Sequence, residues 1–243
     1  GSFTATLTVT GKDGCSGTNP TSTRTITWGQ TPTAAAGTNI SRCDATPLAA
    51  IAMTGATSGG TNSGNTWTGG GGSGTWTQNA TPALATFTPT VTSGSFTATL
   101  TVTGSGACTG TDPTSIRTIT WGQTPTAAAG ATITRCDATP LAAIAMTGAT
   151  AGGSFSAVTW IGGGGSGTWT QNADPALATF TPTVTGGTFT ATLTVTGNNG
   201  CTGTNPTSTR TITWGQTPTA AAGGNLNRCD GTPLAAIAMT GAT

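Results

Sequence analysis

The chain is built on a repeat of 93 residues that continues through its whole length without insertion or deletion. A fixed period of this length corresponds to one domain per repeat, because solenoid repeats are single units of about 20–45 residues. The chain holds about 2.6 periods, so we expect both termini to fall inside repeats of a longer protein. The spacing is marked by Phe3/Phe96/Phe189, Cys15/Cys108/Cys201, Arg24/Arg117/Arg210, Trp28/Trp121/Trp214 and Cys43/Cys136/Cys229.

The most regular stretch of each repeat predicts a half-buried β-strand. Residues 94–104 alternate Phe, Ala, Leu and Val with Thr, and the same pattern occurs at 1–11 and 187–197. Successive side chains of a strand point to opposite faces. We therefore expect one face of this strand to lie in the core and its threonine face to lie in solvent.

One repeat contains about seven such short segments, separated by turn residues. We expect strands at 33–37, 47–54, 66–68, 75–77, 84–91, 96–102 and 114–121, with Arg42, Cys43 and Asp44 in a loop. This number and spacing are typical of an immunoglobulin-like sandwich. The predicted fold class is all-β, with tandem immunoglobulin-like β-sandwich domains.

The segment Trp-Gly-Gln-Thr-Pro, which begins at Trp28, Trp121 and Trp214, is expected at the domain boundaries because proline suits the start of an edge strand. The predicted domains are 1–30 (the last two strands of a partial repeat), 31–123, 124–216, and 217–243 (the first strands of a partial repeat).

The composition argues against an enzyme. Charged residues are 5% of the chain, against about 25% in ordinary domains, and histidine, tyrosine and glutamate do not occur. Of the aspartates, only Asp44 recurs in every repeat, so paired groups for acid–base catalysis are lacking. We expect no catalytic, cofactor or metal site. A net charge of +1 also argues against nucleic acid, and no apolar run is long enough for membrane insertion of this segment.

Six cysteines at two positions per repeat indicate disulfides and an oxidising compartment. In one arrangement Cys43 pairs with Cys108 and Cys136 with Cys201, which leaves Cys15 and Cys229 to partners outside this sequence. In the other, neighbouring domains are joined by Cys15–Cys43, Cys108–Cys136 and Cys201–Cys229. We prefer the first, because a domain with few large hydrophobic residues gains about 4 kcal/mol from an internal crosslink.

The tryptophans of the two full repeats have two expected roles. Trp67 falls on the third strand, where such folds bury a tryptophan, and it is assigned to the core. Trp76 and Trp169 border the glycine-rich loops and are candidate surface-binding residues. The loops themselves lack the lysine and helix of a phosphate-binding loop, which favours close backbone packing or a mobile connection.

The motifs Arg-Cys-Asp, Pro-Leu-Ala-Ala-Ile-Ala-Met-Thr-Gly-Ala-Thr, Ala-Thr-Phe-Thr-Pro-Thr-Val and Phe-Thr-Ala-Thr-Leu-Thr-Val-Thr-Gly occur in this order, ending in a turn cysteine. This order resembles the Ig-like or PKD-like repeats of giant cell-surface adhesins of Bacteroidota, such as SprB-type gliding adhesins. The resemblance implies type IX secretion, cell-surface display and a filament for adhesion or gliding motility.

The expected function is therefore a structural and adhesive rod that displays an adhesive end and transmits force. Its partners are expected to be neighbouring repeats, other surface proteins or glycans, and further copies in a filament. The alternative is a carbohydrate- or surface-binding sandwich that uses Trp76, Trp169 and the glycine-rich loops.

Overall fold

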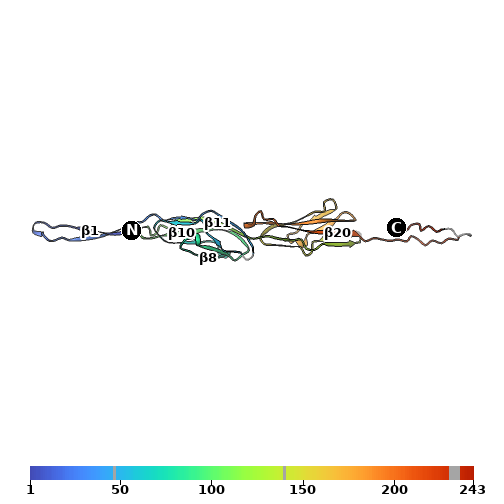
Figure 1. Cartoon of the computed structure of the whole chain (residues 1–243), viewed down its shortest axis with the longest axis horizontal. Coiled ribbons are helices and arrows are strands. Elements are labelled where there is room, and N and C mark those ends of the chain that lie inside the picture. The colour runs from blue at the N-terminus through green and yellow to red at the C-terminus, as the bar shows by residue number, and fades with distance from the viewer. Residues whose placement is uncertain (46–47, 139–140, 230–235) are drawn as a thin grey trace. The chain divides into compact units, whose positions relative to one another are not determined.

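The computed structural model describes residues 1–45, 48–138, 141–229 and 236–243 (Figure 1). The chain divides into two compact units. Unit 1 comprises Gly1–Thr126, Gly152–Ser156 and Thr196–Asn205, and unit 2 comprises Ala127–Ala151, Ala157–Val195 and Pro206–Thr243. Unit 1 thus includes two short segments that belong, by sequence, to the following repeat.

The first full repeat forms a β-sandwich in unit 1. Its strands are β3 (Thr33–Ala35), β4 (Ile40–Asp44), β5 (Ile51–Ala52), β6 (Thr57–Gly59), β7 (Asn62–Thr68), β8 (Gly74–Thr77), β9 (Thr86–Pro89), β10 (Ser93–Gly104) and β11 (Thr114–Gln123), with 3-10 turns η2 (Pro82–Leu84) and η3 (Gly106–Cys108).

Two sheets make up the sandwich, in the orders β4-β11-β10-β7 and β5-β9-β8, and β3 pairs with β6. When the strands are lettered along the chain, the sheet β5-β9-β8 contains strands B, E and D of an immunoglobulin domain. Strands β7, β10 and β11 of the other sheet are then C, F and G. The predicted all-β, immunoglobulin-like fold class is therefore confirmed.

The strand β4 corrects the sequence analysis, which placed Arg42, Cys43 and Asp44 in a loop. It pairs in parallel with β11, from Ile40 opposite Ile119 to Asp44 opposite Gln123. The partner strand lies about 80 residues further along the chain. Parallel strands are not joined by a tight turn, so no turn residues near β4 indicate this pairing. The expectation of a loop failed for that reason.

The regular strand 94–104 lies in the core as expected. Ala98, Leu100 and Val102 of β10 are fully buried and Phe96 is partly buried, whereas Thr97 and Thr103 on the other face are exposed. The largest buried side chains of the same core are Trp67, Phe87, Trp121, Ile51 and Met53.

The second full repeat copies this arrangement, with sheets β13-β20-β19-β16 and β14-β18-β17 and the pair β12-β15. Its elements are β12 (Thr126–Ala128), β13 (Ile133–Asp137), β14 (Ile144–Ala145), β15 (Thr150–Gly152), β16 (Phe155–Ile161), β17 (Gly167–Thr170), η4 (Pro175–Leu177), β18 (Thr179–Pro182), β19 (Gly186–Gly197), η5 (Asn199–Cys201) and β20 (Thr207–Gln216).

Before the first sandwich, β1 (Ser2–Thr8) and β2 (Thr21–Thr27) form an antiparallel hairpin with η1 (Asp13–Cys15) between them. No strand is assigned in the described residues after Gln216, although Ala221 and Thr243 exchange two backbone hydrogen bonds. Pro47, the first residue of an expected strand, and Asp230, the third copy of Asp44, lie outside the described residues.

Candidate functional site

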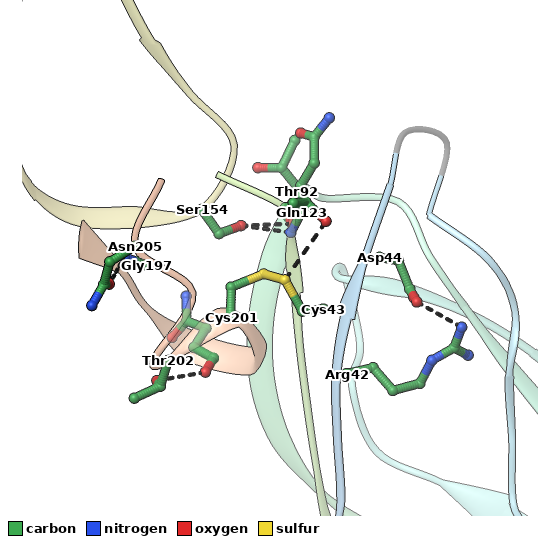
Figure 2. The surroundings of a disulfide bond; sticks show 12 residues. Arg42, Cys43, Asp44, Thr92, Gln123, Ser154, Gly197, Cys201, Thr202 and Asn205 are labelled. Carbon is green, nitrogen blue, oxygen red and sulfur yellow. Dashed lines mark hydrogen bonds and ion pairs between the residues drawn. A yellow bond between two sulfur atoms is a disulfide. The ribbon is translucent and has the colours of Figure 1, made fainter. Parts of the chain in front are cut away.

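A disulfide between Cys43 and Cys201 joins residues 158 positions apart, with a Cα–Cα distance of 4.7 Å. Both cysteines belong to unit 1. Cys43 lies on β4 beside Gly122 of β11, and Cys201 ends the 3-10 turn η5, which packs against β4 and β11 (Figure 2). By sequence, the bond links a strand of one repeat to a turn of the next.

The turn that carries Cys201 approaches β4 closely because its central residue is glycine. A Cβ atom added at Gly200 would overlap the carbonyl oxygen of Arg42. Its neighbour Asn199 has a φ of 48°, in the left-handed region that asparagine tolerates better than most residues. Any larger side chain at position 200 would push the turn away from the strand.

Ser154 forms four hydrogen bonds at the same junction, where it lies beside Gln123 and Thr92 (Figure 2). The backbone N–H of Gln123 donates to Ser154 Oγ at 2.8 Å, and the N–H of Ser154 donates to the carbonyl of Gln123 at 2.8 Å. Ser154 Oγ also donates to the carbonyl of Thr92 at 3.2 Å. The carbonyl of Ser154 accepts from the N–H of Asn198, which ties this loop to the cysteine turn.

Arg42 and Asp44 flank Cys43 of the disulfide and form an ion pair with each other (Figure 2). Arg42 Nη2 lies 2.8 Å from Asp44 Oδ1, and Arg42 Nη1 donates to the carbonyl of Ala50. The recurrence of these two residues around each strand cysteine is explained by this local pairing, which the second repeat forms between Arg135 and Asp137 at 2.7 Å.

Neither predicted set of disulfides is formed. Cys15, Cys108, Cys136 and Cys229 are free thiols, and Cys43 bonds to Cys201. The preferred Cys43–Cys108 pairing fails because Cys43 lies beside Gly122, whereas Cys108 precedes Thr114 at the opposite end of β11. Those ends are roughly 26 Å apart, far beyond the Cα separation that a disulfide spans.

The predicted Cys136–Cys201 pairing fails for the corresponding reason. Cys136 pairs opposite Gly215 near the end of β20, and η5 precedes the start of that strand. The two predicted pairings of the six cysteines depend only on separation along the chain. The pairing that forms depends on the register of β4 against β11, and β4 was not predicted as a strand.

A buried arginine crosses each sandwich, and the sequence analysis had assigned it no role. Arg117 is 3% exposed and donates to the backbone carbonyls of Thr38 and Thr54. Arg210 makes the equivalent bonds to Ala131 and Thr147. Burial lowers the pKa of both guanidinium groups, because desolvation penalises the charged form. Both act as structural donors to backbone carbonyls in the loops that they reach.

The candidate surface-binding residues Trp76 and Trp169 lie in aromatic clusters. Trp76 stacks on buried Trp67, with ring centroids 5.7 Å apart, and contacts Phe87 and Phe96 through tilted and edge-on packing. Its indole N–H donates to the carbonyl of Gly69. Trp169 makes the same stacking on Trp160 and the same bond to Gly162.

The glycine-rich loop next to Trp76 is a site of close packing. Gly69 and Gly70 have φ values of 109° and 69°, and a Cβ atom on Gly70 would overlap the Phe96 ring. Of the two roles considered from the sequence, the backbone-packing one is the role that the structure shows.

The described residues contain no cluster of three or more cysteine and acidic side chains that could hold a metal ion. In the same part of the chain, no helix has the length and apolar character needed to cross a membrane.

At the disulfide junction, Gln123 and Ser154 are residues to which the sequence assigned no role. A signal for them exists in the repeat: Gln30, Gln123 and Gln216 recur, and position 154 is a serine where the preceding repeat has Thr61. The hydroxyl therefore recurs, and Thr61 makes the same contact, accepting from the N–H of Gln30 at 2.9 Å.

No protein-family model matches the chain, and no curated protein sequence matches it. Similar solved structures include an I-band fragment of titin (12% identity, TM-score 0.38, 76% of this chain and 65% of that one). Another is the structure of immunoglobulin domains 1–5 of Sidekick-1 (13% identity, TM-score 0.45, 80% of this chain and 40% of that one). A third is a fragment of mouse cadherin-23 (13% identity, TM-score 0.34, 89% of this chain and 74% of that one). The chain therefore spans less than two thirds of the titin and Sidekick-1 fragments.

Proposed function

We propose that the chain is a structural and adhesive repeat region of a long extracellular filament or stalk at the cell surface. The observation that carries the proposal is the Cys43–Cys201 disulfide, which crosslinks one repeat to the next. Disulfides persist in oxidising compartments outside the cytosol, so the bond supports export. The low content of charged residues and the aromatic core of each sandwich are consistent with a structural role.

The disulfide gives the array a specific mechanical property. When force is applied at the two ends of the chain, the load crosses the bond and bypasses the 158-residue segment that the bond closes. That segment would otherwise extend by about 520–570 Å, at roughly 3.3–3.6 Å per residue. The crosslinked region can therefore carry tension without releasing most of its length.

The finer parts of the proposal are the display of an adhesive end, the transmission of force in adhesion or gliding motility, and export by type IX secretion. They derive from the resemblance to Bacteroidota adhesin repeats. Neighbouring repeats, surface proteins or glycans, and copies of the chain in a filament are the proposed partners. The packing of Trp76 and Trp169 against Trp67 and Trp160 does not favour the alternative glycan-binding role.

Single-molecule pulling on the whole chain, held at its two ends, tests the force-bearing role. Under oxidising conditions we expect the total released length to fall short of the full contour by about 520–570 Å, and a reductant to restore it. The matched control is Cys43→Ser, which should release the full length under both conditions.

Two results would contradict the proposal. One is an oxidised chain that releases its full contour length at low force, because such a chain could not act as a tether. The other is the failure of antibodies against this segment to label intact cells that produce it, since a surface filament must be accessible from outside.

A further inference from the structure

The surroundings of Cys136 in unit 2 match those of Cys43 in unit 1, but Cys136 is a free thiol and Cys43 is bonded to Cys201. It pairs in parallel opposite Gly215 as Cys43 does opposite Gly122. Its Sγ lies 3.7 Å from Thr217 Oγ1, which equals the distance between Cys43 Sγ and Thr124 Oγ1. The thiol is exposed.

The backbone next to Cys136 is also arranged as it is next to Cys43. The N–H of Thr217 donates to the carbonyl of Asp137 at 2.8 Å, just as that of Thr124 donates to Asp44. The flanking Arg135–Asp137 ion pair matches Arg42–Asp44. This strand therefore already has the conformation that forms a disulfide in unit 1.

A second observation in unit 2 is an open groove beside this strand end. It has a volume of about 540 Å³ and is lined by Thr185, Gly186, Gln216, Thr217, Pro218 and Thr219. Thr185 and Gln216 occupy the repeat positions of Thr92 and Gln123. In unit 1, these are the two residues whose backbone groups bind Ser154.

From this correspondence we propose that Cys136 and the groove are the receiving half of a second disulfide junction. The occupant is a further repeat of the same kind that follows in the same chain. Its loop, equivalent to Gly152–Ser156, would fill the groove, and its cysteine turn, equivalent to Thr196–Asn205, would bring a thiol to Cys136. The inference concerns Cys136 alone and is independent of the mechanical proposal for Cys43–Cys201.

The bond forms by exchange with a small disulfide such as oxidised glutathione. The Cys136 thiolate attacks one sulfur and releases one glutathione thiolate, and the turn cysteine thiolate then attacks the mixed disulfide and releases the second. Two protein thiols are oxidised to one disulfide, one oxidised glutathione is reduced to two thiols, and two protons pass from the cysteines to the products.

The shape of the junction restricts which turn is accepted. The residue before the turn cysteine must be glycine, since a Cβ atom at Gly200 would overlap the Arg42 carbonyl. The turn of Cys108 has Ala107 at this position and the turn of Cys201 has Gly200. A copy of the Cys201 turn is therefore the appropriate probe.

The test extends the full chain by a copy of residues 151–216 placed directly after Thr243. This extension continues the third repeat in register, because Thr243 occupies the position of Thr150. The added turn carries Thr202→Ser, so that its peptide differs in mass from the original. After refolding with reduced and oxidised glutathione, free thiols are alkylated and disulfide-linked peptides are mapped by mass spectrometry.

We expect Cys136 to lose its alkylation and to be joined to the added copy of Cys201 in monomers, with Cys43–Cys201 intact as the internal control. Gly200→Ala in the added turn, or Ser154→Ala in the added loop, should lower the yield of the new bond. The original chain should keep Cys136 alkylated.

Three results would overturn the proposal. The first is a Cys136 that remains alkylated in the extended chain while Cys43–Cys201 is formed. The second is a bond from Cys136 to Cys108 or Cys229. The third is a disulfide-linked dimer through Cys136, which would assign the groove to a second copy of the chain. None of these results affects the pulling test of Cys43–Cys201.

Discussion

The hairpin β1–β2 and the hairpin β10–β11 have nearly the same sequence and the same register, but they differ in burial. Phe3 pairs opposite Ile26 as Phe96 pairs opposite Ile119. Leu7 is nevertheless 66% exposed where Leu100 is 0% exposed, and Trp28 is 54% exposed where Trp121 is 1%. Strand pairing is thus identical in two regions whose packing is entirely different.

The difference separates what a hairpin does alone from what a sandwich adds. The pairing of β1 with β2 requires only their own alternation and the turn between them. Burial of the same side chains on β10 and β11 requires β4, β7 and the facing sheet β5-β9-β8. Among the described residues, the sheet of β1 and β2 has no further strand and no facing sheet. The hairpin therefore provides a matched control for positions 114–121, whose equivalents are residues 21–28.

The largest effect is expected for Trp121→Ala, with Trp28→Ala as its control. The first change removes a fully buried indole and should lower the free energy of unfolding of unit 1 by about 3–5 kcal/mol, because a cavity remains. Urea denaturation measures this free energy of unfolding, and hydrogen exchange of peptides from β10 distinguishes unit 1 from unit 2. A comparable loss in Trp28→Ala would mean that the hairpin is packed in solution and that the comparison fails.

A smaller effect is expected for Arg117→Met, compared with Arg24→Met. The buried guanidinium donates to the carbonyls of Thr38 and Thr54, which would be left without these donors at a cost of about 2 kcal/mol. Arg24 is exposed on β2, and its replacement should be neutral. Both variants are compared by the midpoint of urea unfolding. A stabilised Arg117→Met variant would show that the desolvation cost of the charge exceeds the value of its hydrogen bonds.

The smallest effect is expected for Ser115→Ala, compared with Ser22→Ala. Ser115 Oγ accepts a hydrogen bond from the N–H of buried Ala36 at 3.0 Å, and its loss should cost about 1 kcal/mol. Faster exchange of the Ala36 amide is the specific readout. Ser22 is exposed, so the control should not change either measurement. An unchanged Ala36 amide in Ser115→Ala would show that water replaces the hydroxyl.

The strands of the sandwich were largely predictable because their signals are local. Alternation identified β10 and β11, and Trp67 was correctly assigned to the core. The short strands β4 and β6 were missed, since each is stabilised by a partner that no nearby turn indicates. The domain boundaries at 30, 123 and 216 stay predictions.

The candidate site was predicted only in part. Cys43 and Cys201 were both named, but each was given the wrong partner. A hydroxyl recurs at positions 61 and 154, but its role could not be inferred from that, because only the structure places Gln123 and Thr92 around Ser154.

The sequence by itself determined the 93-residue period, the strand alternation and the immunoglobulin-like class, because each of these is a property of neighbouring or regularly spaced residues. Only the tertiary structure decided which cysteines bond and which arginines are buried. A disulfide between residues 158 apart depends on which ends of which strands meet. The parallel register of β4 on β11 determines those ends, and it arises from contacts that are distant in the sequence.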